Sequence, residues 1–178
     1  MFVELFDFQQ KALDNLRERQ IKAQRRYRED KEKSIIPFTA PTGAGKTIIM
    51  SAFIEALYTG DSYQGAQNDA IVLWISDAPE LNEQSKAKLF KVADKLWTRN
   101  VVTIDEHSFK ADKLQLGTIY YVNTQKFGVN SNLVKYSDER NYTGWDFMRN
   151  TIEEYGDKLV VSLMRLTAAP NLTKWVRR

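Results

Sequence analysis

The feature that most constrains this sequence is a glycine-containing loop between a short apolar stretch and a helical pattern. The loop reads Ala40-Pro41-Thr42-Gly43-Ala44-Gly45-Lys46-Thr47. Its glycines allow a tight turn that points several backbone N–H groups inward, and a helix starting near Lys46 adds the positive end of its dipole. Lys46 supplies a positive charge for phosphates, and the Thr47 hydroxyl can bind Mg²⁺. Ala40 replaces the first glycine of the general pattern, and an ordinary glycine turn is the alternative, but this context predicts a phosphate-binding loop.

Apolar strands and helical patterns alternate along the rest of the chain. Strands are predicted at residues 34–39, 70–76, 101–104, 118–122 and 159–166. Helices are predicted from residue 8 with Asp7 as the cap, at 46–58, from 79 onwards and at 145–155. This alternation predicts an α/β domain whose mainly parallel sheet is covered on both faces. The 178 residues suffice for one such domain.

Composition excludes several classes of chemistry. The chain has no cysteine, which excludes disulfides and thiolate metal sites, and His107 is its only histidine. Its apolar runs are far too short to cross a bilayer. The first residues carry acids and no basic stretch, unlike a signal peptide. We therefore expect a cytoplasmic protein with no membrane partner.

Positive charge is concentrated in one run of the sequence. The net charge is only +3, but in residues 17–33 basic residues outnumber acidic ones about two to one. The main interpretation is a solvated helix with opposite charges at helical spacing. A surface that faces phosphates is the alternative.

The loop, in the form Ala-Pro-Thr-Gly-Ala-Gly-Lys-Thr, resembles that of superfamily 2 helicases and translocases. Residues 8–13, Phe-Gln-Gln-Lys-Ala-Leu, resemble the segment that precedes the loop in those proteins, in which a glutamine reads adenine. The resemblance implies that Gln9 contacts the base, with Gln10 as a second candidate. A glutamine amide donates and accepts at once, which matches the N6 and N7 edge of adenine. A surface glutamine on a helix is the alternative.

Three later segments resemble further motifs of these helicases in the same order. Residues 71–84 resemble motif Ia, which lies near the nucleic-acid backbone, and residues 119–127 resemble a segment of the branch that includes type III restriction enzyme helicase subunits. Residues 166–170 resemble motif III, which couples the nucleotide site to strand binding, although Ala169 replaces its second hydroxyl residue. The implied nucleic-acid and coupling residues are Pro79, Gln84, Asn123, Thr124, Gln125 and Thr167.

The resemblance implies a RecA-like P-loop fold of three layers. Residues 1–178 would form one ATP-binding lobe, with an N-terminal helical segment at 1–33 and an incomplete P-loop core at 34–178. ATP and Mg²⁺ are the implied cofactors, bound by Gln9 and by residues 41–47, with Lys46 catalytic and Thr47 ligating the metal. DNA is the implied partner, RNA the alternative, together with a second helicase lobe or a partner subunit.

The acids that hydrolysis requires are not where the family places them. Superfamily 2 proteins carry an Asp-Glu-x-His box after an apolar strand shortly before motif III, but Ser162 follows residues 158–161 here. A similar pattern, Asp105-Glu106-His107, follows residues 101–104, ahead of the Asn123 segment rather than after it. Asp105 and Glu106 are either the working acids or solvated charges at a strand end.

Three functions remain open from the sequence. The first is the N-terminal motor lobe of a helicase or restriction-enzyme subunit, held as a fragment or truncated product and weakly hydrolytic alone. The second is a degenerate module that binds nucleotide without hydrolysing it. The third is another class of P-loop ATPase that uses Asp105 and Glu106.

Overall fold

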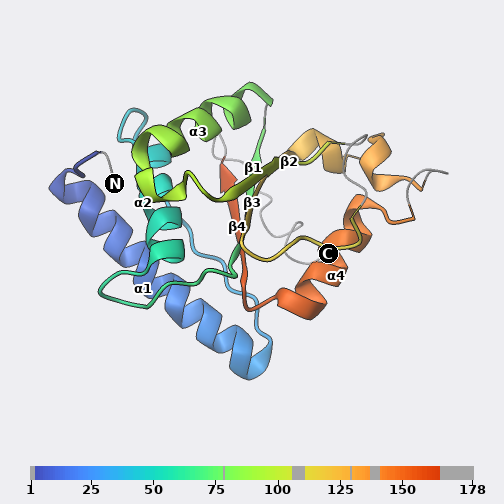
Figure 1. The fold of residues 1–178 in the computed structure, drawn as a ribbon, viewed down its shortest axis with the longest axis horizontal. Helices are drawn as coiled ribbons and strands as arrows, with labels where there is room; N and C mark the ends of the chain where they lie inside the picture. The colour runs from blue at the N-terminus through green and yellow to red at the C-terminus, as the bar shows by residue number, and fades with distance from the viewer. Residues whose placement is uncertain (1–2, 78, 106–110, 129, 137–140, 165–178) are drawn as a thin grey trace.

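The computed structural model describes residues 3–77, 79–105, 111–128, 130–136 and 141–164 (Figure 1). Its helices are α1 (Asp7–Asp30), α2 (Lys46–Thr59), α3 (Pro79–Val92) and α4 (Gly144–Tyr155), and its strands are β1 (Ile71–Ser76), β2 (Asn100–Thr103), β3 (Thr118–Asn123) and β4 (Leu159–Met164). Short 3-10 helices span Asp94–Leu96, Thr124–Phe127 and Asn132–Val134. Most predicted elements are therefore present within a few residues of their expected bounds.

The four strands form one parallel sheet in the order β2-β3-β1-β4. The central strands β1 and β3 are buried at every position, which explains their unbroken apolar sequences. Ser76 at the end of β1 aligns with Asn123 of β3 on one side and with Met164 of β4 on the other. The expected parallel α/β fold is thus confirmed.

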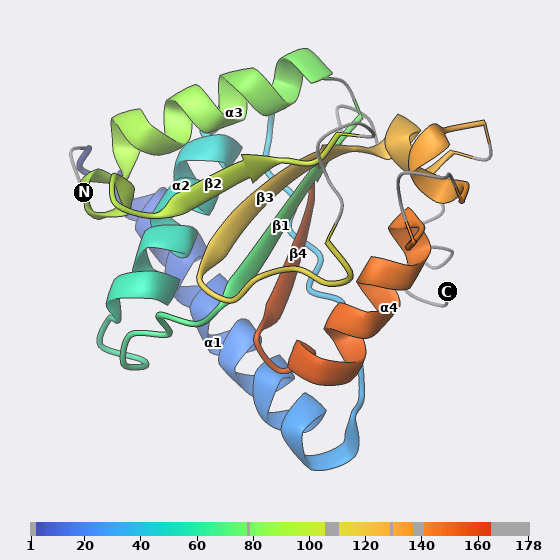
Figure 2. The same cartoon turned by 45° about the vertical axis from the view of Figure 1, so that its right-hand side comes forward.

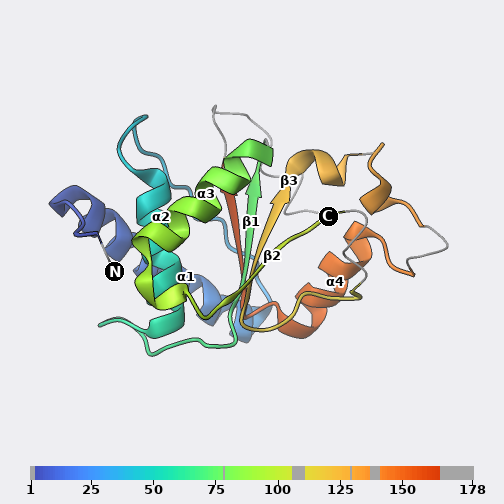
Figure 3. The same cartoon turned by 45° about the horizontal axis from the view of Figure 1, so that its top comes forward.

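Alternate residues of the strands serve two separate cores. Val72 and Trp74 of β1 face a cluster with residues of α1, α2 and α3. Ile71 and Leu73 face a second cluster that includes Phe147 of α4. Figures 2 and 3 show the corresponding layers, with α1, α2 and α3 on one face of the sheet and α4 on the other. The three-layer arrangement expected from the sequence is present.

The strand predicted at residues 34–39 is absent. Residues 31–41 contain no helix or strand, and within the described residues no backbone-to-backbone hydrogen bond involves residues 32–40. Pro37 has no N–H to donate to a neighbouring strand. Ile36 and Phe38 nevertheless pack on the core cluster that also receives Val160 and Met164 of β4. Apolar packing alone therefore places this segment.

The last strand begins where it was predicted, at Leu159, and β4 is described as far as Met164. Ser162 is buried inside this strand, so the strand does not stop before Ser162, where the search for the acidic box had placed its end. Residues 165–178, which include the segment that resembles motif III, lie outside the described residues.

The charged run forms the second half of α1, a single helix of 24 residues. The helix begins one residue earlier than predicted, with Phe6 rather than Asp7 in the cap position. Arg25 and Glu29 pair at i,i+4 spacing on its exposed side, as expected for a solvated helix. Its other side carries buried polar residues that the pattern had not indicated.

Candidate phosphate-binding site

The glycine loop lies where parallel α/β sheets usually bind ligands. Figures 1 and 3 show the start of α2 on the same side of the sheet as the arrowheads of β1, β3 and β4. Ligands of such folds bind outside the carboxyl ends of the strands. Residues 41–43 are exposed and residues 44–47 are half-buried, so the loop is open to solvent on one side and supported on the other.

Two glycines set the shape of the loop. Gly43 and Gly45 have φ angles of 86° and 81°, in the left-handed region that side chains rarely adopt. A Cβ atom added at Gly43 would meet nothing within 4 Å, so space is open beside it. A Cβ atom at Gly45 would lie 2.5 Å from Nε2 of Gln9. The backbone angle therefore favours glycine at position 45, and a side chain there would also displace the amide group of Gln9 from the loop.

Lys46 lies across the loop. Its Nζ atom donates to the carbonyl oxygens of Ala40 at 2.5 Å and of Pro41 at 3.2 Å, which leaves one of three N–H donors for another acceptor. The first turn of α2 has no side-chain cap and no acidic residue. Its unpaired N–H groups and the positive end of the helix dipole favour an anion. The loop can therefore bind a phosphate group.

Gln9 joins α1 to this loop. Its Oε1 accepts a hydrogen bond from the Phe6 N–H at 3.1 Å, and its Nε2 donates to the carbonyl oxygen of Ala44 at 3.1 Å. Gln9 is buried, whereas Gln10 is exposed and bonded to Asp14. The structure thus brings Gln9 to the loop and leaves Gln10 outside it. One N–H and one lone pair of the Gln9 amide remain for a further partner.

A buried polar cluster holds α1 in place, and sequence reasoning missed it. Arg17 is 1% exposed and its Nε atom lies 2.5 Å from Oδ2 of Asp61, in the loop after α2. Arg17 also donates to Gln20 at 2.8 Å, and Gln24 donates to Gln67 and to the carbonyl oxygen of Asp157, each at 2.8 Å. The i, i+3, i+7 spacing of Arg17, Gln20 and Gln24 was the signal that could have revealed a buried polar face.

The environment of Asp61 favours its charged form. Burial acts to raise the pKa of Asp61, but hydrogen bonds from Arg17 and from the backbone N–H groups of Gln64 and Tyr63 outweigh it, so the pKa is lowered. The Arg17–Asp61 pair therefore carries full charge at neutral pH.

The candidate acids follow different strands of the sheet. Asp105 follows β2, the edge strand that is three strands from β4, or about 14 Å at the usual strand spacing. Glu106 and His107 lie outside the described residues. Asp77 follows β1, directly beside β4, and sequence reasoning did not consider it as an acid for this site although it also ends an apolar strand. Within the described residues, no three metal-ligating side chains cluster together.

The described residues that resemble nucleic-acid motifs lie in or after the ends of β1 and β3, at the carboxyl edge of the sheet. Pro79 is the first residue of α3, and Gln84 is exposed farther along that helix. Asn123 ends β3 beside β1, and its Oδ1 atom accepts from the Gln125 N–H at 2.7 Å, with Thr124 between them. Thr167 lies outside the described residues.

Comparison with known proteins gives one match. A family model described as "Type III restriction enzyme, res subunit" matches residues 2–171 of the chain. No curated protein and no solved structure matches it. In the described part of the chain, no helix combines the length and apolar character needed to cross a membrane.

Proposed function

Because the chain belongs to the family of type III restriction enzyme res subunits, a family of helicase-type ATPase domains, we propose that its loop binds ATP with Mg²⁺ and that it is the ATP-binding lobe of a DNA helicase or translocase. The observation that carries the proposal is the loop itself. Lys46 lies across it, the start of α2 has no cap, and the space beside Gly43 is open.

These residues fit a nucleoside triphosphate with its metal ion. The Lys46 Nζ group, which donates to the carbonyl oxygens of Ala40 and Pro41, can donate to phosphate oxygens instead. The first N–H groups of α2 can donate to the same phosphates. The Thr47 hydroxyl is the side chain of the first turn that can ligate Mg²⁺. The metal ion, when bound, would offset negative charge on the phosphates. Gln9 is the residue that can read adenine, because it alone of the two candidate glutamines reaches the loop.

Binding is tested by the melting temperature in the presence of a non-hydrolysable ATP analogue with Mg²⁺. At about a hundred times its dissociation constant, a ligand stabilises the folded state by roughly 2.7 kcal/mol. We expect this increase for the parent chain and its loss in Lys46→Ala. Lys88→Ala, at an exposed lysine of α3, is the matched control and should keep the increase. An unchanged melting temperature of the parent at millimolar analogue would refute the proposal.

A second function, nucleotide binding without useful hydrolysis, is favoured by the end of β4. Met164 ends the strand where the family carries its acids, and residues 165–178 contain no Asp or Glu. Fast hydrolysis in superfamily 2 proteins also uses a second lobe, and we propose that such a lobe or a partner subunit is required here. Pro79, Gln84 and Asn123–Gln125 are the proposed contacts to DNA, with RNA as the alternative strand.

A further inference from the structure

The basic residues of α1 divide into two groups. Three have acidic partners: Arg17 pairs with Asp61, Arg25 with Glu29, and Arg28 with Asp157. Four others, Lys11, Arg19, Lys22 and Arg26, are exposed and show no acidic partner among the described residues. Lys11 lies near the start of the helix, so Arg19, Lys22 and Arg26 form the group of neighbouring cations in its second half.

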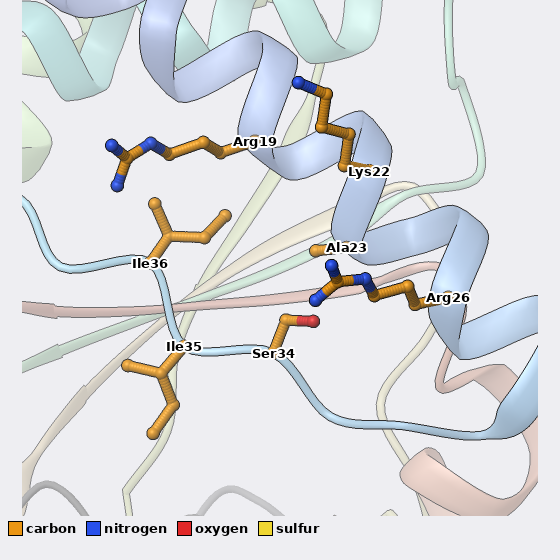
Figure 4. A pocket seen from close by; sticks show the side chains of 7 residues that line it. All are labelled: Arg19, Lys22, Ala23, Arg26, Ser34, Ile35 and Ile36. Carbon is orange, nitrogen blue, oxygen red and sulfur yellow. The ribbon is translucent and has the colours of Figure 1, made fainter.

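These three cations share one groove. They lie at i, i+3 and i+7 and so occupy one face of the helix. Together with Ala23 and residues 34–36 they line a hollow of about 240 Å³, and no acidic residue lines it (Figure 4). Figure 4 shows the guanidinium groups of Arg19 and Arg26 extending toward the segment that carries Ser34 and the two isoleucines. We call this hollow the α1 groove.

Acidic residues gather on a different side of α1. Desolvation raises the pKa of Tyr63, and the nearby charges of Asp14, Glu18 and Asp61 raise it further, which places these acids around the loop after α2. Asp30, one turn beyond Arg26, is exposed and does not line the groove. Asp14 and Glu18 thus lie toward residues 61–63, whereas Arg19, Lys22 and Arg26 lie toward residues 34–36.

We propose that the α1 groove binds the phosphodiester backbone of a nucleic-acid strand. Arg19 and Arg26 are separated by about 10.5 Å along the helix axis, so the two guanidinium groups can contact different phosphates of one strand. Guanidinium groups bind phosphate oxygens in pairs, and the Ser34 hydroxyl is a further donor. Ile35, which is 47% exposed, and Ile36 offer an apolar surface for the carbon atoms of the sugars.

The groove is separate from the nucleotide loop. Arg19 lies ten residues along α1 from Gln9, or about 15 Å, and Arg26 lies farther still. A row of three charges in an open groove fits a polymer with regularly spaced charges better than a single small anion. The contacts are to the backbone, so binding should not depend on base sequence.

The test measures binding of a fluorescent 20-nucleotide oligothymidylate by anisotropy at several salt concentrations. Each phosphate contact adds about 0.7 to the slope of log affinity against log salt for a single strand. The triple variant Arg19→Gln/Lys22→Gln/Arg26→Gln should lose about 2 units of this slope and at least tenfold in affinity at low salt. Each single variant should lose about 0.7, which keeps the test valid if the triple variant unfolds.

A second triple variant is the matched control. Arg25→Gln/Lys88→Gln/Lys95→Gln removes the same net charge at exposed positions outside the groove and should keep affinity and slope within twofold of the parent. An oligouridylate and a duplex of equal length show which nucleic acid the backbone contact prefers. The melting shift with the ATP analogue should persist in the groove variant, so that failure here is distinguishable from failure of nucleotide binding.

Three results would overturn the proposal. The first is a parent chain that binds none of these nucleic acids at low salt. The second is a groove variant whose affinity and slope equal those of the parent. The third is displacement of the oligonucleotide by polyglutamate of equal charge at equal concentration. This result would assign the groove to an acidic protein segment.

Discussion

At the scale of single residues, Gly45 has the most restrictive surroundings in the phosphate loop. Its φ angle is 81°, and a Cβ atom at this position would approach Nε2 of Gln9 to 2.5 Å, so two separate constraints act on it. Gly43 shares the backbone angle but has open space beside it. The two positions therefore separate the cost of the backbone angle from the cost of the close contact.

Gly45→Ala should lower the free energy of unfolding by about 1–3 kcal/mol, the range for a side chain held in the left-handed region. Gly43→Ala should cost less, because only the angle is unfavourable there. Gly65→Ala, where a Cβ atom meets nothing within 4 Å and φ is not positive, should change stability by no more than about 0.5 kcal/mol. Urea unfolding measures all three, and equal stability of the Gly45 and Gly65 variants would contradict the geometry of the loop.

Gln9→Ala should remove a preference for ATP over GTP. The hydrogen bonds of an amide to one base are worth about 1–3 kcal/mol of discrimination. Gln10→Ala is the control, because Gln10 bonds Asp14 away from the loop. Isothermal titration with both nucleotides measures the preference. Equal affinities of the parent for ATP and GTP would show that Gln9 only links α1 to the loop.

At the scale of secondary-structure elements, α1 determines where Gln9 lies, and the Arg17–Asp61 pair determines where α1 lies. Arg17 is fully buried beside Phe53 of α2, and its guanidinium lies 5.8 Å from the centre of that ring. Gln24 adds contacts to Gln67 and to the carbonyl oxygen of Asp157. The helix is thereby attached to two loops that are distant in sequence.

Asp61→Ala should destabilise the fold strongly, because it leaves Arg17 buried without its counter-charge. Breaking a buried pair costs about 3–5 kcal/mol, and we expect the lower end because the Asp61 side chain is 20% exposed. Arg25→Ala, which breaks the exposed pair with Glu29 on the same helix, should cost less than about 1 kcal/mol. Chemical denaturation measures the free energy of unfolding of both variants. Similar losses in Asp61→Ala and Arg25→Ala would contradict a larger contribution from the buried pair.

The same pair predicts a dependence on pH. The pKa of Asp61 is lowered from 3.8, so its contribution to stability is complete above about pH 4 and is lost as the pH falls through the lowered value. The stability difference between the parent and Asp61→Asn should therefore shrink as the pH is lowered from about 6 to about 2. A difference that stays constant over this range would show that Asp61 does not titrate as the structure indicates.

At the scale of the whole molecule, strand order separates Asp105 from the central strand β1 and from β4. β2 lies at the far edge of the sheet from β4, so Asp105 follows a strand that does not adjoin β4 or β1. β1 ends at Ser76 and is followed by Asp77, and β4 ends at Met164. Asp105 is therefore separated from β1 and β4 by β3, whereas Asp77 directly follows β1.

We expect the isolated chain to hydrolyse ATP at about 10⁻³ s⁻¹ or below, the rate of P-loop enzymes that work without an added arginine. Single-stranded DNA should stimulate it little. Asp105→Asn, Glu106→Gln and Asp77→Asn are compared with the parent by phosphate release, with nucleotide binding measured in parallel. A robust parental rate that Asp105→Asn or Glu106→Gln lowers at least a hundredfold, with binding intact, would identify these residues as the catalytic acids.

Much of the fold was predictable because its signals are local. The glycine loop, the helix from Lys46 and the buried strands β1 and β3 were all expected, since backbone freedom at glycine and the length of an apolar run depend on few neighbouring residues. The strand expected at 34–39 was wrong for the opposite reason. A strand requires a partner, and whether these residues pair depends on distant parts of the chain.

Local sequence patterns were enough to predict a parallel α/β domain with a glycine loop ahead of a helix, because side-chain periodicity and glycine geometry act over a few residues. The tertiary structure placed Gln9, the first candidate, beside the loop, and only the tertiary structure showed that Arg17 is buried against Asp61 and that Asp105 follows an edge strand. It also brought Arg19, Lys22 and Arg26 to one groove, with no acidic partner among the described residues. These outcomes depend on which distant segments share a surface after folding, and local pattern carries no information about that choice.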